Sequence, residues 1–157
     1  MKILTAALLA SCIFAVPAVA DSIMPREGWA VHDTDHSYND LITRVKSAAK
    51  ANKMGVVTEA GPTVVLKSKG INVPGNRVIG IYHPQFAVRV IALSVPAMIE
   101  APIRMYVTED SDGTATLSYK MPSFVFAPYV DAAGAELSAI AKELDAKFAA
   151  IAADAVK

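Results

Sequence analysis

The spacing of apolar residues changes near residue 38 from alternation to the helical period of about 3.6 residues. Residues 29–35 are typical of a strand at a sheet edge. From Tyr38 onward the spacing predicts a helix, with Ser37 as its N-cap and Gly55 as its stop signal. The predicted buried face of this helix consists of Tyr38, Leu41, Ile42, Val45, Ala48 and Ala49.

The middle of the chain alternates between short strands and helical segments. We expect strands at 56–60 and 77–82, separated by a short irregular or helical segment at 61–70. Pro84 suits the first turn of a helix that continues over Gln85–Ser94, because its missing N–H costs nothing there. Two further strands, 103–109 and 114–120, should form a hairpin, because Asp112-Gly113 favours a tight turn.

The last third of the chain contains an aromatic stretch, 123–130, followed by an alanine-rich tail. Apolar residues recur at helical spacing in this tail and predict a final helix at about 132–156. The order strand, helix, several strands, helix predicts a two-layer α+β domain. The predicted stripe of the final helix is Leu137, Ile140, Ala141, Leu144, Phe148, Ile151 and Ala155.

The first twenty residues, "MKILTAALLASCIFAVPAVA", have the layout of a secretory signal peptide, with cleavage expected after Ala20. Residues 21–157 would then form one domain, with 21–28 as a short leader, in the periplasm or outside the cell. A lipid anchor at Cys12 is an alternative, but more apolar chain follows Cys12 instead of a polar tether. Cys12 is the only cysteine, so the mature domain would contain no disulfide.

Charge and motifs exclude several function classes. The 15 basic and 15 acidic residues balance, and no basic cluster exceeds "LKSK", so a nucleic-acid partner is not expected. The sequence lacks GxSxG, HExxH and a phosphate-binding loop. These absences argue against an enzyme, although an enzyme of unknown reaction remains an alternative.

His83 is the sharpest candidate for chemistry, because it stands where a strand meets a helix. Its ring could meet an anionic ligand near the free N–H groups of the first helical turn. The alternative is that His83 only caps its own helix, which is the commoner role of residues at such corners. A polar constellation of Tyr82, His83, Arg104 and Tyr119 could gather at one end of the sheet and bind a ligand.

A metal site is a second hypothesis, and the sequence predicts no other cofactor. His32 and His36 lie in "HDTDH", but on a strand this spacing separates them by about 13 Å, too far to share one ion. Only His36 could join His83 on a metal or haem, if the chain turned toward the sheet. The five methionines after residue 20 lack copper-motif spacing and suit core filling.

Three segments, "HSYNDLITRVKSAAKANKMGVV", "IGIYHPQFAVRVI" and "EAPIRMYVTEDSDGTATLSYKMPS", resemble the family known as domain of unknown function 302. The resemblance covers about Thr34 to Tyr129, and its most specific part is the hairpin with the upstream Pro102. It implies a curved, mainly antiparallel sheet with helices on one face, similar to the TATA-binding-protein-like class and often dimeric. The chain departs from the family pattern at His83, where members commonly have Asn, and at Ala101, where many have Leu.

The resemblance implies no activity, because one fold hosts unrelated functions. We expect a non-catalytic module that binds a small ligand or a second copy of itself. In this hypothesis the sheet is a rigid platform and the Tyr82-His83 corner gives polar specificity. The aromatics Phe124, Phe126 and Tyr129 would form an apolar wall, unless they are a structural plug beneath the final helix.

Overall fold

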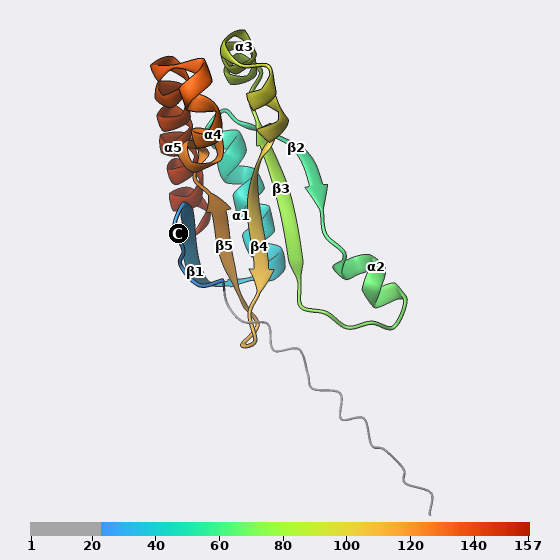
Figure 1. Cartoon of the computed structure of the whole chain (residues 1–157). Coiled ribbons are helices and arrows are strands. Elements are labelled where there is room, and N and C mark those ends of the chain that lie inside the picture. Colours follow the sequence, from blue (N-terminus) through green and yellow to red (C-terminus); the bar gives the residue numbers. More distant parts are fainter. Residues whose placement is uncertain (1–22) are drawn as a thin grey trace, which may run out of the picture.

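The computed structural model describes residues 23–157, so the expected signal peptide and Cys12 lie outside the described residues. The chain alternates strands and helices and then ends in two consecutive helices (Figure 1). The strands are β1 (Trp29–Ser37), β2 (Gly55–Ala60), β3 (Asn76–Tyr82), β4 (Ile103–Glu109) and β5 (Thr114–Lys120). The helices are α1 (Tyr38–Ala51), α2 (Thr63–Ser68), α3 (Pro84–Leu93), the 3-10 helix η1 (Pro96–Glu100), α4 (Pro122–Ala133) and α5 (Ala135–Ala155).

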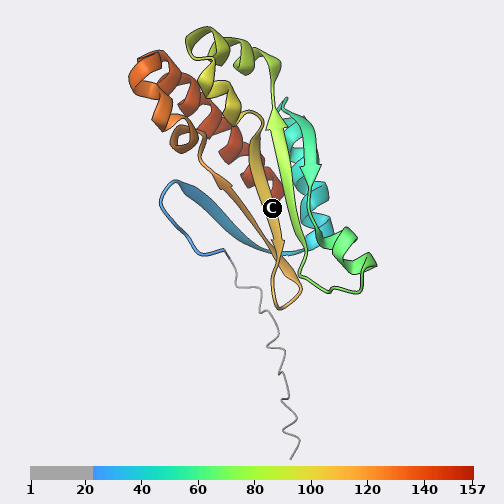
Figure 2. The same ribbon diagram turned by 45° about the vertical axis from the view of Figure 1, so that its right-hand side comes forward.

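The strands form one five-stranded sheet in the order β1-β5-β4-β3-β2, and every neighbouring pair is antiparallel. The first strand of the chain therefore pairs with the last, which the local sequence pattern did not specify. Helices pack on one side of this sheet and leave most of the other side open (Figure 2). The predicted α+β class, with a mainly antiparallel sheet and helices on one face, is confirmed.

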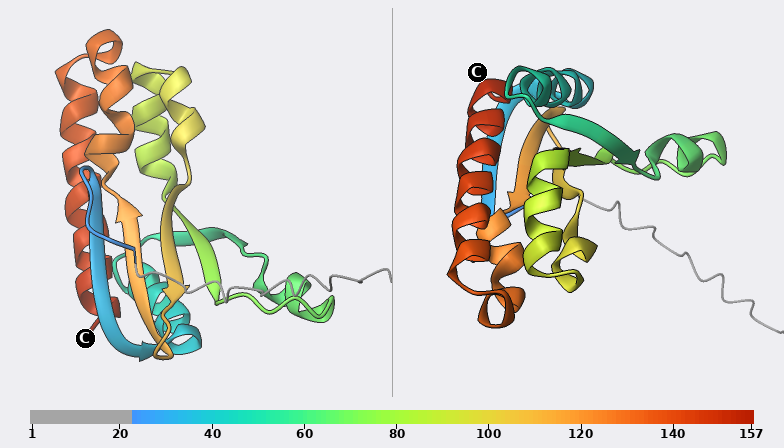
Figure 3. Two further views of the ribbon diagram at one scale, coloured as in Figure 1. Left: turned by 60° about the horizontal axis from the view of Figure 1, so that its bottom comes forward. Right: turned by 90° about the horizontal axis from the view of Figure 1, so that it is seen from above.

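The core lies between the sheet and the helices α1 and α5, which lie side by side on the covered face (Figure 3). Alternate residues of β3, β4 and β5 point into it, as the two-residue period of a strand requires. The sheet contributes Ile79, Ile81, Met105, Val107 and Leu117, and the helices contribute Leu41, Val45, Leu137, Ile140 and Phe148, all of them buried.

Two helix starts follow the sequence signals. The Ser37 hydroxyl accepts a hydrogen bond from the Asp40 N–H at 3.3 Å and caps α1, as predicted. At α3, Nδ1 of His83 accepts the Gln85 N–H at 3.2 Å, and Pro84 takes the first helical position. His83 therefore performs the capping role that was the alternative to chemistry.

The aromatic stretch forms an additional helix, α4, which the sequence pattern did not predict. Its apolar residues surround the whole helix and Pro128 lies inside it, so neither periodicity nor breaker residues marked it as helical. Gly134, with φ of +85°, then separates α4 from α5, so the final helix begins at Ala135 and not near 132. Within residues 23–157, no helix has both the length and the apolar character needed to cross a membrane.

The short helix α2 stands apart from the rest of the domain. It projects beyond the edge strand β2, at the right of Figure 1, and none of its residues is buried. Glycines Gly61 and Gly70 flank the segment. This arrangement places the polar residues of α2 beside the ends of β3 and β4 but outside the main core.

Candidate ligand-binding site

The open face of the sheet carries two rows of side chains that run across the strands. The strand registers place Thr58, Gly80, Arg104, Lys120 and Trp29 in the first row. They place Ala60, Val78, Tyr106, Ser118 and Val31 in the second row. The first row is thus charged and the second is mostly apolar or aromatic.

A trough of about 460 Å³ lies along these rows. Its volume falls within the range of about 300–1,000 Å³ that is typical of small-molecule sites. The connection after β2, the helix η1 and the helix α4 form its sides. The trough is lined by Trp29, Ala60, Gly61, Pro62, Asn76, Val78, Glu100, Ile103, Arg104, Tyr106, Tyr119, Lys120 and Val125.

Arg104 and Lys120 bring two positive charges together at one end of the trough. The hairpin pairs Met105 with Tyr119, so the next residues outward, Arg104 and Lys120, lie opposite each other. Both side chains are exposed, and the ion pairs among residues 23–157 involve neither of them. Like charges opposite each other across a strand pair repel, so an anion at this point would be attracted by both.

Trp29 extends the positive row toward β1. The Lys120 ammonium lies 5.8 Å from the centre of the Trp29 ring, and the Arg26 guanidinium lies 5.1 Å from it. Both distances permit cation–π attraction. Gly28 precedes the tryptophan with φ of +74°, and a side chain there would collide with the ring of Phe124 on α4. Glycine at position 28 thus lets α4 approach the start of β1.

Glu100 is the carboxylate that lines the trough, and it is already engaged. Tyr129 of α4 donates a hydrogen bond from its hydroxyl to Glu100 Oε1 at 2.8 Å. This hydrogen bond is the main reason that the pKa of Tyr129 is raised. The interaction joins α4 to η1 at the side of the trough, and Glu100 makes no ion pair with Arg104 or Lys120.

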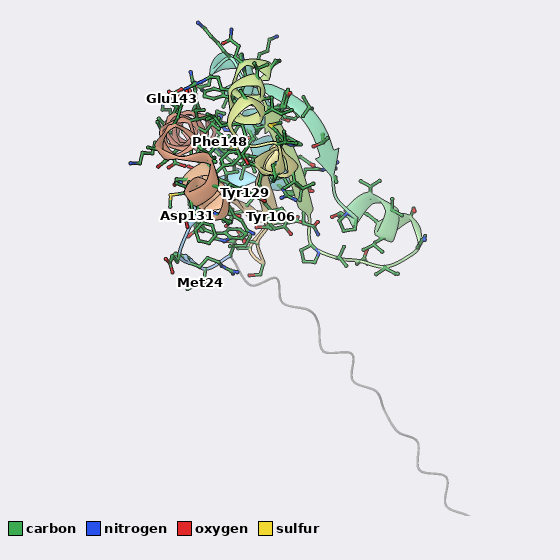
Figure 4. The ribbon with its side chains drawn as sticks, turned by 45° about the horizontal axis from the view of Figure 1, so that its top comes forward. Met24, Tyr106, Tyr129, Asp131, Glu143 and Phe148 are labelled. Carbon is green, nitrogen blue, oxygen red and sulfur yellow. The ribbon has the colours of Figure 1, made fainter. Side chains whose placement is uncertain are left out.

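Tyr106, labelled in Figure 4, lies in the middle of the trough. Burial raises the pKa of its hydroxyl, and the nearby Tyr38 raises it further. A neutral tyrosine is therefore maintained well into alkaline conditions, as an aromatic surface with one hydroxyl group. Beside it, the Ser118 hydroxyl is fully buried without a hydrogen-bond partner among residues 23–157.

The four residues of the predicted constellation divide between two cavities. Arg104 and Tyr119 line the trough, whereas Tyr82 and His83 border a separate cavity of about 30 Å³ among apolar side chains. The Tyr119 ring itself packs on the covered side, 5.6 Å from the ring of Phe148. The structure thus does not bring the four polar groups into one site, and the trough takes its charge from Arg104 and Lys120.

His36 is also distant from His83 in the fold. It lies at the end of β1 beside α1, where its Nε2 accepts a hydrogen bond from Arg44 at 3.0 Å and its Nδ1 lies 3.4 Å from Asp40. His83 follows β3 at the opposite end of the sheet. Within residues 23–157, no three His, Cys, Asp or Glu side chains gather as metal ligands.

The aromatic residues of α4 have mixed roles. Phe126 is buried in the core, Phe124 is largely exposed beside Gly28, and Tyr129 bonds to Glu100. The apolar side of the trough comes instead from Val125, together with Val78 and Tyr106 of the sheet. No motif in the sequence marked Trp29, Val78 or Lys120 as a binding residue. The Lys120 position could have been found by counting the hairpin register outward from its turn.

A crystal structure of an uncharacterised conserved DUF302 protein from Bacillus stearothermophilus is similar to this chain. The two share 21% sequence identity with a TM-score of 0.73, and the match covers 84% of this chain and 100% of that one. At this level of identity the similarity supports the fold alone. No curated protein matches the chain.

The stretch of the chain that matches the family is longer than the stretch that carries the recognisable motifs. It includes β1 from Ala30 onward and the whole of α5. Residues 30–155 match the family described as "Domain of unknown function DUF302", and the chain belongs to this family.

Proposed function

We propose that this protein binds a small amphipathic carboxylic acid in the trough on the open face of its sheet. The observation that carries the proposal is the pair Arg104 and Lys120, which lie opposite each other without a carboxylate partner at one end of a largely apolar trough. Such a site suits a ligand with one anionic group and an apolar body.

The positions of the charged row and the apolar row determine how the ligand would lie in the trough. Its carboxylate would lie between the Arg104 guanidinium and the Lys120 ammonium, where charge-assisted hydrogen bonds are strongest. Its apolar body would follow the second row, over Tyr106, Val78 and Ala60. The engaged carboxylate of Glu100 at the side of the trough would disfavour ligands with a second negative charge there.

The role is binding and not catalysis. The trough residues include no histidine or cysteine, and its one carboxylate accepts a hydrogen bond from Tyr129. General acid–base chemistry needs a group that titrates near the working pH, within reach of the substrate. Arg104, Lys120 and Tyr106 supply charge and surface instead.

Fluorescence of Trp29, the only tryptophan in the chain, gives a direct test. We expect octanoate to change the Trp29 emission saturably, and octanol to bind more weakly because it lacks the charge. Arg104→Gln and Lys120→Gln should each weaken octanoate binding by about tenfold, the value of one lost charge-assisted hydrogen bond. Arg89→Gln, a change on α3 away from the trough, is the matched control and should leave binding intact.

An unchanged emission at high octanoate, or equal binding by all the charge variants, would overturn the proposal. Sedimentation of the same variants addresses self-association through this face. If Arg104→Gln alters the sedimentation coefficient and octanoate does not bind, the open face is an interface between copies and not a ligand site.

Export to the periplasm or beyond is the second part of the proposal, and the first twenty residues support it. An open, charged binding face suits a protein that meets small molecules entering from outside. Mass spectrometry of the protein from its native host checks this part. An N-terminus at Asp21 is the expected result, and an intact N-terminus would contradict it.

A further inference from the structure

A second pocket, which we call the α2 pocket, lies where α2 meets the adjacent ends of β3 and β4. It has a volume of about 400 Å³ and shares no lining residue with the trough. Segments far apart in sequence form it: the start of α1, the helix α2, and the adjacent ends of β3 and β4. It is lined by Tyr38, Asn39, Thr63, Val64, Lys67, Ser68, Gly75, Arg77 and Glu109.

Two buried donors in this pocket lack partners. Nε of Arg77 is buried with no hydrogen-bond acceptor among residues 23–157, and the same holds for the hydroxyl of Tyr38. An atom without accessible surface cannot donate to a molecule in the pocket. Such a molecule would therefore contact Arg77 through its terminal guanidinium nitrogens, which form no ion pair within residues 23–157.

The carboxylate of the pocket does not satisfy Arg77. Glu109 accepts a hydrogen bond from the Gly75 N–H at 2.7 Å and forms no ion pair with Arg77. Lys67 of α2 adds a second positive charge, and it too makes no ion pair in the described part of the chain. Positive charge thus exceeds negative charge among the lining residues.

We propose that the α2 pocket binds a phosphate group, carried by inorganic phosphate or a small phosphate ester. Arg77, Lys67 and Asn39 together offer more donors than the two oxygens of a carboxylate can accept, whereas a phosphate group has enough oxygens. The fork of the Arg77 guanidinium matches two phosphate oxygens. This site is independent of the proposed function of the trough.

Tyr38 forms a fixed part of the pocket lining. Gly75 lies against the Tyr38 ring so closely that a side chain at position 75 would collide with it. The ring is therefore held between α1 and the start of β3. Lys67, by contrast, comes from the projecting helix α2, so phosphate would connect α2 to the body of the domain.

The test is an NMR titration of the purified protein with inorganic phosphate, with glycerol 2-phosphate and acetate as parallel arms. We expect saturable shifts of the backbone amides at Tyr38, Asn39, Gly75 and Arg77 with both phosphates, and weaker binding of acetate. Stronger shifts with glycerol 2-phosphate would identify an ester as the better ligand, and stronger shifts with phosphate would identify the free ion.

Variants separate a phosphate site from a general effect of salt. Arg77→Gln and Lys67→Ala should each weaken phosphate binding by about tenfold or more. Because Lys67 is exposed, Lys67→Ala keeps the test valid even if Arg77→Gln does not fold. Arg89→Gln on α3, a residue that lines neither the trough nor the α2 pocket, is the matched control and should bind phosphate normally. Absence of saturable shifts, equal affinity for acetate, or normal binding by Lys67→Ala would overturn the proposal.

Discussion

Neighbouring residues of β4 and β5 face two different environments. Met105, Val107 and Leu117 are fully buried under α1 and α5, whereas Arg104 and Lys120 are exposed on the other side of the same strands. Between them, Thr116 and Ser118 are buried hydroxyl residues on the open face. The covered face is packed mainly with apolar side chains, whereas the open face keeps the charged groups of Arg104 and Lys120 exposed to a ligand. We infer that stability depends mainly on the covered face and binding on the open one.

Of the variants that test this difference, Phe148→Ala on the covered face should have the largest effect on stability. Phe148 is fully buried and packs beside Tyr119, so its removal should lower the free energy of unfolding by about 3–5 kcal/mol. Phe124→Ala, a change of the same size at a residue that is 43% exposed, is the control and should cost less. Urea unfolding measures both variants, and equal losses would contradict the difference between the faces.

A smaller effect is expected at Gly80, in the charged row of the open face. A side chain there would collide with Thr58 Oγ1 and with the ring of Pro102. Gly80→Ala should therefore destabilise the protein by about 1–3 kcal/mol, as overpacking does. At Gly55 on the edge strand β2, added atoms meet only ordinary contacts, so Gly55→Ala should change stability little. Thermal melting of the two variants decides whether the open face tolerates added volume at Gly80.

The loss of stability at alkaline pH allows one tyrosine from each face to be compared. Burial raises the pKa of Tyr119 and of Tyr106, with Asp145 and Tyr38 as the respective further causes. The folded state holds these protons more tightly than the unfolded state. Their contribution to stability is therefore complete below about pH 10 and is lost as the pH rises through the folded-state pKa values.

Tyr119→Phe and Tyr106→Phe should each make the decline in unfolding free energy above about pH 10 less steep. The effect should be larger for Tyr119, which is 4% exposed, than for the half-buried Tyr106. Denaturant unfolding at a series of pH values measures both slopes. A steeper decline in either variant would contradict the cause assigned to its raised pKa.

The smallest effect concerns the repulsion between Arg104 and Lys120. Without a ligand, Arg104→Gln should stabilise the fold by about 0.2–1 kcal/mol, because like charges opposite each other are unfavourable. Added salt should reduce this gain by screening. Arg89→Gln is the control, since Arg89 of α3 pairs at 2.7 Å with Glu143 of α5, which is labelled in Figure 4. The loss of this ion pair should give no gain in stability. A loss of stability in Arg104→Gln would show that its charge has a partner on the open face.

Local signals predicted most of the elements, because each depends on residues close together in sequence. Ser37 starts α1, Pro84 starts α3, and Asp112-Gly113 closes the β4–β5 hairpin, all as expected. The helix α4 was missed because its apolar residues show no single face and Pro128 interrupts them. Helix propensity and periodicity predict a helix poorly when its residues are apolar on all sides.

The site was harder to predict because it depends on strand order. Arg104 was identified from the sequence, and Lys120 lies opposite it through the β4–β5 hairpin, but Trp29 comes beside Lys120 only because β1 pairs with β5. Tyr82 ends β3 and His83 follows it, yet both border a different cavity because the chain turns into α3 there. Alternation along a strand predicts which side a residue faces, but not which strand lies beside it.

The weak packing of α2 against the domain has a consequence for local unfolding. With no buried residue, α2 should detach locally at a small fraction of the cost of global unfolding. Trypsin should then cleave first after Lys67 or Lys69, while the sheet and the helices α1 and α5 stay intact. When α2 closes faster than trypsin cuts, the cleavage rate measures the fraction of molecules in which α2 is detached.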